Sequence, residues 1–272
     1  MSIHRLADRT LVLMSGSEVE PLLQRLITTD LDDLEMGKAG YGALLTPQGK
    51  IIMDFLVARK PEGFLFDLAS SSADEFVKKM TLYRMRSDVT IDKLDAAVGL
   101  SFTDHPDAVA DPRSELLGYR LRGEPGAFAV DEAMQAEYEA RRVRAVVADS
   151  GKDFSPGDVF PHDINMDCLE GLDFAKGCYV GQEVVSRMKH RGTARRRLVA
   201  ITAGVPLPES GTQIMADNKP IGTLGTVSGT AGLAIVRFDR VSEAIKESQP
   251  MFAGEAEVAV TLPTYASFSL ND

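Results

Sequence analysis

The chain of 272 residues has only two cysteines, Cys168 and Cys178, and this scarcity limits its chemistry. A disulfide between them would add little stability to a chain of this size, and a reducing compartment would keep both thiols free. Two cysteines without neighbouring ligands do not make a zinc site. A stable iron–sulfur cluster normally needs about four protein ligands, so we do not expect the chain to carry one alone.

A long apolar run is also missing. No stretch approaches the roughly 20 apolar residues that cross a bilayer, and residues 1–8 contain no run of signal-peptide length. The apolar fraction of 44% and the charged fraction of 26% are ordinary for a globular protein. We therefore expect a cytoplasmic protein with no membrane contact.

Positive charge is scarce overall but concentrated in one segment. The formal net charge is −10, which predicts repulsion of nucleic acid and anionic membranes. Residues 176–197 nevertheless contain seven Lys or Arg against one acid, Glu183. Such a segment is either a specific anion site or a solvated face paired with acids elsewhere, and the sequence leaves both readings open.

Short apolar runs separated by turn residues predict an α+β protein. Ser17 and Glu20 have the spacing of a helix capping box, and Ser72 with Glu75 repeats it. The remaining expected elements are strands at 11–14, 51–58, 64–69 and 89–91, a loop at 104–118 and a helix at about 132–144. Beyond Arg197, short apolar runs alternate with Gly, Pro and Thr, which is typical of a small antiparallel barrel or sandwich.

Cys178 lies in the segment with most chemical content. Gly177 and Gly181 flank it and permit close backbone approach or positive φ. The residues from Gln182 onward have helical potential, so Cys178 is expected in a turn near a helix start. A helix N-terminus and a nearby cation such as Lys176 favour the thiolate, although a free cysteine is also commonly a small buried apolar residue.

The motif around this cysteine resembles a known signature. Lys176-Gly177-Cys178-Tyr179-Val180-Gly181-Gln182-Glu183 matches K-G-C-[FY]-x-G-Q-E of the YgfZ family. These folate-binding proteins are related to the aminomethyltransferase (T-protein) of the glycine cleavage system. Further similar elements are Leu26–Asp30, Leu44–Asp54, Tyr83–Val89, Phe160-Pro161 with Asn165, and Arg187 with His190-Arg191-Gly192.

The resemblance implies a fold. It is a three-domain ring with ferredoxin-like α/β domains and a C-terminal β-barrel. The implied folate-binding domain is discontinuous and comprises residues 1–45 plus about 120–192. Residues 46–119 would form a second α+β domain, and residues 193–272 the barrel.

The resemblance also implies a function, as an accessory protein for assembly or repair of iron–sulfur clusters in client enzymes. One such client is a radical-SAM enzyme that modifies tRNA. The implied cofactor is tetrahydrofolate or a one-carbon derivative, and the implied partners are cluster-containing clients or assembly factors, without stable nucleic-acid binding. Cys178 would be the functional thiol, assisted by Lys176. The implied folate contacts are Asp54, Asp163, Asn165, Tyr179, Gln182, Glu183 and Arg187.

Two positions depart from the transferase pattern. True aminomethyltransferases carry paired Asp residues where this chain has Met53 and Asp54, which disfavours the alternative of a folate-dependent transferase. An isolated Asp in a strand is more often an ordinary solvent-facing residue, and the residues by themselves favour that reading of Asp54. Asp163 is one methylene shorter than the Glu that holds the pterin in transferases, and it can either contact the pterin or cap a turn. The histidines His162 and His190 are too isolated to indicate a metal site. A third alternative, RNA binding by residues 187–197, conflicts with the overall acidity.

Overall fold

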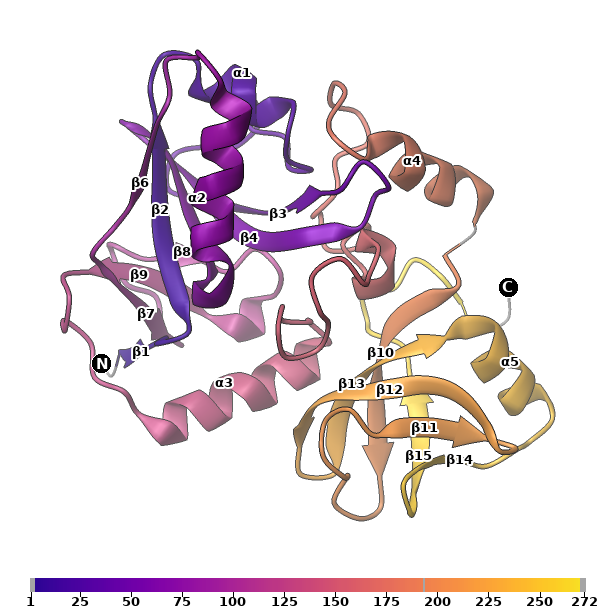
Figure 1. Ribbon diagram of the computed structural model, residues 1–272. Coiled ribbons are helices and arrows are strands. Elements are labelled where there is room, and N and C mark those ends of the chain that lie inside the picture. Colours follow the sequence, from indigo (N-terminus) through magenta and orange to yellow (C-terminus); the bar gives the residue numbers. More distant parts are fainter. Residues whose placement is uncertain (1–2, 193, 270–272) are drawn as a thin grey trace.

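Three β-sheets organise the chain, and the computed structural model describes residues 3–192 and 194–269 of it (Figure 1). The first sheet has five strands in the order β3-β4-β5-β2-β6, and the second has four in the order β1-β7-β9-β8. The third closes into a barrel in the order β10-β13-β12-β11-β14-β15. The expected α+β fold with a C-terminal barrel is therefore confirmed.

The first sheet packs one face against two helices. Along β4, alternate side chains face these helices, and Phe55 meets Phe66 and Phe76 in edge-on ring contacts at 5.0 and 6.0 Å between centroids. The strands are β2 (Arg9–Ser15), β3 (Ala39–Leu45), β4 (Ile51–Lys60), β5 (Gly63–Ala69) and β6 (Thr90–Lys93), and the helices are α1 (Val19–Gln24) and α2 (Ser70–Arg84). The predicted hairpin and the strand at 89–91 are confirmed.

Both predicted serine caps are wrong. Helix α1 begins at Val19 with Glu18 at the N-cap, because the Ser17 hydroxyl donates instead to the carboxylate of Asp88 at 2.7 Å. Helix α2 begins at Ser70, so Ser72 lies inside its first turn and is buried. For Ser17, a contact distant in sequence replaced the local hydrogen bond.

Helix α3 is linked to the second sheet by side-chain hydrogen bonds. Its strands are β1 (His4–Arg5), β7 (Ala97–Ser101), β8 (Val109–Ala110) and β9 (Tyr119–Gly123), and α3 spans Glu132–Ala145. The Asp131 side chain accepts hydrogen bonds from the N–H groups of Ala133 and Met134, which fixes the start of α3. The expected helix is confirmed. The expected loop at 104–118 is interrupted by β8 and by a 3-10 turn at Glu115–Leu117, because β8 pairs with β9.

The barrel consists of β10 (Arg196–Ala203), β11 (Gln213–Ala216), β12 (Lys219–Ser228), β13 (Ala231–Arg237), β14 (Met251–Ala253) and β15 (Ala256–Thr261). Helix α5 (Phe238–Lys246) connects β13 with β14 and buries Val241 and Ala244 against the barrel core. This helix was not predicted from the sequence. Phe238, Val241 and Ile245 have helical spacing, but the short strand-like runs on either side obscured that pattern.

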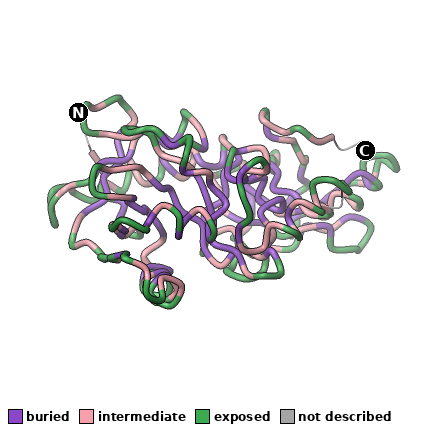
Figure 2. The backbone as a smooth tube through the Cα atoms, turned by 90° about the horizontal axis from the view of Figure 1, so that it is seen from above, coloured by how far each residue is buried: buried purple, intermediate pink, exposed green. Residues whose placement is uncertain are grey.

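A central segment joins the three sheets. It runs from the end of α3 through the 3-10 turn Pro161–Ile164 to helix α4 (Gln182–Arg191), which lies between the first sheet and the barrel in Figure 1. One apolar core combines Leu56 of the first sheet, Leu100 of the second and Leu198 of the barrel. In Figure 2 this buried backbone runs along the middle of an elongated molecule, with exposed turns at the edges. The predicted domain boundaries remain predictions; the first, at residue 45, falls between strands of one sheet.

Candidate functional site

The sulfur of Cys178 lies on the surface, in a loop that precedes helix α4. Cys178 and Gly177 are both exposed. The loop ends at Gly181, whose φ of +84° lies in the left-handed region. A Cβ at this position would lie 2.7 Å from the carbonyl oxygen of Thr46, so glycine is required for the loop to pack against the β3–β4 turn. The prediction of a turn next to a helix start is confirmed.

Lys176 anchors this loop from below. Its side chain is buried, and Nζ donates to the backbone carbonyls of Ile27 at 3.1 Å and Thr29 at 2.5 Å. Burial lowers the pKa of Lys176 to about 8, although the nearby acids, led by Asp30, oppose this shift. The Asp173 carboxylate accepts from the N–H of Lys176 at 2.8 Å and closes the turn. The loop is thus fixed at its base and presents its thiol outward.

The buried side chain of Tyr179 packs beneath the Cys178 loop. The residue is 6% exposed, and its ring lies 5.7 Å from the Lys176 nitrogen. Burial raises the pKa of its hydroxyl to about 12, so the phenol is neutral. Within the described part of the chain, that hydroxyl has no hydrogen-bond partner. Tyr179 therefore stabilises the loop chiefly by packing.

Asp163 and Asn165 lie near the barrel. The Asp163 carboxylate accepts from the N–H of Phe160 at 3.0 Å and from Arg196 at 2.7 Å, so it caps the 3-10 turn and forms a partly shielded ion pair. Burial raises its pKa against these opposing contacts. The Asn165 amide donates to the carbonyl of Leu198 at 2.9 Å. Both side chains connect the central segment to the barrel.

Gln182, Glu183 and Arg187 lie on helix α4. Gln182 is half-buried, whereas Glu183 and Arg187 are exposed. The single buried side chain of this helix is Val185, which joins the central apolar core. These three residues lie on the helix that directly follows the Cys178 loop. Their contact with folate stays a prediction.

Asp54 is not solvent-facing, and that reading is wrong. The residue is 5% exposed on β4 and accepts a hydrogen bond from the Tyr41 hydroxyl at 3.2 Å. Burial, reinforced by the nearby Asp149 carboxylate, raises its pKa. Strand alternation places Asp54 on the face of the sheet that meets the second sheet, opposite the face covered by α1 and α2.

A buried network of charged residues occupies the junction between the first and second sheets. Asp67 accepts from Arg9 at 2.6 Å, and Asp111 accepts from Arg113 at 2.8 Å and from Arg120 at 3.1 Å. Arg120 also donates to the Tyr138 hydroxyl at 2.7 Å. The guanidinium groups of Arg113 and Arg120 hold the pKa of Asp111 well below its usual range, against the cost of burial. This network was not predicted from the sequence, although Asp67, which interrupts an otherwise apolar strand run, was a usable signal.

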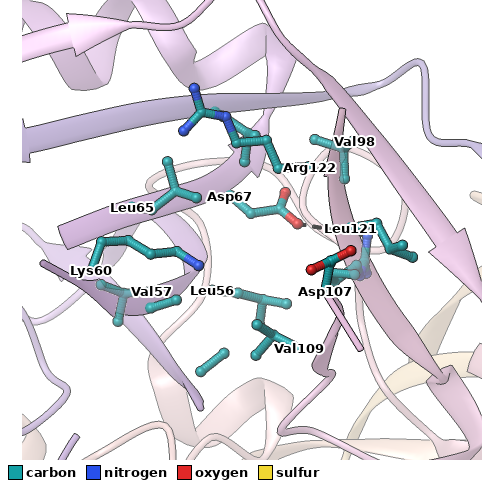
Figure 3. A pocket seen from close by; sticks show the side chains of 14 residues that line it. Leu56, Val57, Lys60, Leu65, Asp67, Val98, Asp107, Val109, Leu121 and Arg122 are labelled. Atoms are coloured by element: carbon teal, nitrogen blue, oxygen red, sulfur yellow. Dashed lines mark ion pairs between the residues drawn. The ribbon is translucent and has the colours of Figure 1, made fainter. Parts of the chain in front are cut away.

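A small cavity of about 70 Å³ opens beside this network (Figure 3). Its walls are largely apolar, and Asp67 and Arg120 contribute its buried charges. Asp67 Oδ2 and Arg120 Nε and Nη1 have no hydrogen-bond partner among the described residues. Lys60 and Arg122 also line it, and Arg122 is exposed. None of the seven predicted folate contacts is among the lining residues of this cavity.

Metal-binding clusters and membrane-spanning helices are both absent from residues 3–192 and 194–269. This part of the chain contains no group of three or more His, Cys, Asp or Glu able to hold a metal ion. It also contains no helix long and apolar enough to span a membrane.

Two segments match models of known domain families. Residues 9–102 match the GCVT N-terminal domain, and residues 195–268 match the CAF17 C-terminal beta-barrel domain. The fold is that of the glycine cleavage system aminomethyltransferase T from Bartonella henselae. The two align with a TM-score of 0.71 over 97% of this chain and 86% of that chain, at 12% identity. The chain thus joins a GcvT-like part to a CAF17-type barrel, and the finer assignment to YgfZ stays a prediction.

The chain is also similar to curated proteins called mitochondrial iron–sulfur cluster assembly factor IBA57. The human protein is 28% identical over 87% of this chain and 78% of its own length. The Pyricularia oryzae homologue is 27% identical over 92% and 75%, and the mouse protein is 27% identical over 94% and 82%. These relatives contradict the prediction of a cytoplasmic location. Composition and free thiols fit any reducing aqueous compartment, so they could not distinguish the cytoplasm from the mitochondrion.

Proposed function

We propose that the chain is an accessory protein of iron–sulfur cluster assembly in which Cys178 provides a thiolate ligand to a cluster in transit. The observation that carries this proposal is the exposed sulfur on a loop anchored by the buried ammonium of Lys176. The similarity to cluster assembly factors supports the same role.

The cluster is cargo shared with a partner. A cluster normally needs about four protein ligands, whereas Cys178 is the single cysteine of its loop and the described residues hold no group of three candidate ligands. A partner must therefore supply the remaining ligands. An exposed thiolate on a fixed loop suits this arrangement, because both proteins must reach the same iron atoms without the loop refolding.

We further propose that a reduced folate binds in the cavity of Figure 3. A pterin edge presents N–H donors beside a carbonyl oxygen. Asp67 Oδ2 and Arg120 Nη1 lie 3.8 Å apart as an ion pair, and neither atom has a hydrogen-bond partner among the described residues. The Asp67 oxygen can accept from the donors, and the Arg120 nitrogens can donate to the carbonyl. Lys60 and Arg122 can attract the glutamate carboxylates of the tail. Bound folate would supply a one-carbon carrier there, and the protein's own residues orient the ring and exclude water from it.

The resemblance to YgfZ extends the proposal to clients, one of which would be a radical-SAM enzyme that modifies tRNA. The alternative function, folate-dependent aminomethyl transfer, has the shared fold in its favour. Met53 replaces the first carboxylate of the transferase pair and is buried among apolar residues. Formation of methylenetetrahydrofolate from an aminomethylated carrier protein would favour the transferase.

The test uses a strain that lacks its own cluster assembly factor of this type. Wild type, Cys178→Ala and the control Cys168→Ala are expressed in it, and the activity of a cluster-containing client enzyme is measured. We expect rescue by wild type and by Cys168→Ala, and none by Cys178→Ala. Full rescue by Cys178→Ala would eliminate the thiol mechanism.

A further inference from the structure

The four cations that follow the Cys178 loop on one short stretch have no ion-pair partner among the described residues. They are Arg187, Lys189, Arg191 and Arg195. All four are exposed. We call this set the α4 cationic surface.

The contrast with the next two arginines is informative. Arg196 pairs with Asp163 at 2.7 Å, and Arg197 pairs with Asp167 at 2.6 Å, so these two serve the fold. The Lys189 ammonium lies 3.6 Å from the centroid of the Phe174 ring. Among the described residues, the side chains of Arg191 and Arg195 form no hydrogen bond, ion pair or cation–π contact. Contacts within the fold therefore explain Arg196 and Arg197, and the Phe174 ring accounts for part of the position of Lys189, whereas Arg187, Arg191 and Arg195 have no such contact.

This surface is unusual for the molecule that carries it. The net charge of the whole chain is −10, and residues 176–197 hold seven Lys or Arg against one acid. The remainder is correspondingly more acidic and repels an acidic partner. An acidic partner is thus attracted at α4 and repelled elsewhere, which orients the encounter before contact is made.

The position of the surface links it to the thiol. Helix α4 begins at Gln182, four positions after Cys178, and its basic last turn continues away from the loop on the outer side of the molecule (Figure 1). Its N-terminal half is fixed by Val185 in the core and by Val184, which lies against Gly49. The three cations of the helix, Arg187, Lys189 and Arg191, are therefore held at a constant offset from the Cys178 loop.

We propose that the α4 cationic surface docks an acidic face of the protein that shares the cluster with Cys178. This inference rests on the proposed function and specifies the chemistry of its partner. Nucleic acid and anionic membranes also carry negative charge, but the strongly acidic remainder of the chain disfavours such extended polyanions. A protein with a local acidic patch meets the cations without meeting that remainder.

The first test measures binding by the full chain to a labelled poly-L-glutamate of about 20 residues, to tRNA and to phosphatidylserine vesicles. The variant R191E/R195E changes two exposed side chains that form no hydrogen bond, ion pair or cation–π contact among the described residues. The control K78E/K246E makes the same change in net charge at exposed lysines of α2 and α5. We expect poly-glutamate binding to fall at least about tenfold in R191E/R195E, to stay within about twofold in the control, and to weaken with salt. Unchanged binding by R191E/R195E, or tighter wild-type binding to tRNA or vesicles than to poly-glutamate, would overturn the proposal.

The second test repeats the rescue experiment with the same variants, after thermal unfolding has shown that each is folded. We expect R191E/R195E to lose most of the rescue and K78E/K246E to keep it. If Cys178→Ala fails and R191E/R195E rescues like wild type, only the docking surface is refuted. If Cys178→Ala itself rescues, both the proposed thiol function and the docking proposal that rests on it are refuted.

Discussion

The ammonium of Lys176 donates to the carbonyl oxygen of Thr29 across 147 positions of sequence, at 2.5 Å. This contact ties the loop of the exposed Cys178 to the segment before β3. A cationic donor bound to neutral carbonyls inside a protein is worth more than the same bond in water, but its charge is costly to bury. The lowered pKa of Lys176, about 8, records that balance.

The first prediction concerns pH and the variant Lys176→Met. In the folded chain the proton of Lys176 is lost near pH 8, whereas in the unfolded chain it stays until about pH 10.5. The unfolded state therefore binds more protons in this window, and the contribution of Lys176 to the free energy of unfolding rises with pH. This stabilising contribution of Lys176 is fully present above about pH 10.5 and is lost as the pH falls through 8.

Urea unfolding of both proteins at pH 7, 9 and 10.5 measures this effect. The stability of wild type relative to Lys176→Met should rise along that series, by up to about 1.4 kcal/mol per pKa unit of difference between the two states. A relative stability that is flat or falling would show that the ammonium is not destabilised by burial.

The second prediction concerns thiol accessibility. A negatively charged aromatic disulfide reagent should modify native Cys178 quickly, because its sulfur is exposed. Cys168 is partly buried and its sulfur lies 3.2 Å from the Ser267 hydroxyl, so it should react at least about tenfold more slowly. Cys178→Ala should remove the fast phase and Cys168→Ala the slow one. Equal rates would mean that the loop is not held as described.

The third prediction concerns the folate cavity. Lys60→Ala and Arg122→Ala should each weaken binding of reduced pteroylglutamate about tenfold, since each removes one charge-assisted contact to the tail. Reduced pteroic acid, which lacks the glutamate, should bind both variants like wild type. Lys79→Ala, on the outer helix α2, serves as the control. Loss of pteroic acid binding as well, or no effect on either ligand, would place the folate elsewhere.

The fourth prediction concerns the buried network. Asp111→Asn leaves Arg113 and Arg120 without their carboxylate partner, and both guanidinium groups are buried. Breaking such a pair costs about 3–5 kcal/mol, which corresponds to a fall in Tm of roughly 10 °C for a chain of this size. Because the folded pKa of Asp111 is depressed, this loss should be largest above about pH 4 and should shrink as the pH falls.

Asp239→Asn provides the control for that experiment. Asp239 pairs with Arg237 at 2.6 Å, but the Asp239 side chain is 53% exposed. Its loss should change stability by less than about 1 kcal/mol. Similar unfolding midpoints for the two variants would contradict the assignment of Asp111 to a buried network.

Local pattern was sufficient for several elements. The hairpin of β4 and β5 follows from two apolar runs around a short turn, and α3 follows from its helix-forming residues and the Asp131 cap. The turn before α4 follows from Gly181, whose conformation few other residues tolerate. The predicted Ser17 cap failed because Ser17 donates to Asp88, 71 positions away, and the predicted Ser72 cap failed because α2 begins two residues earlier, at Ser70. Helix α5 went unpredicted although Phe238, Val241 and Ile245 have helical spacing, because the short strand-like runs around it were given more weight.

The sequence by itself determined the α+β class, the C-terminal barrel and the cysteine turn, since apolar spacing, turn residues and one motif are all local. The tertiary structure alone decided that the sulfur of Cys178 points outward, that Lys176 is bound beneath it, and that Asp67 and Arg120 share a cavity. These facts depend on which distant backbone carbonyl or carboxylate meets each side chain once the sheets pack. The reason is physical: burial and pairing set the energy of a charge, and neither is defined until the chain has folded.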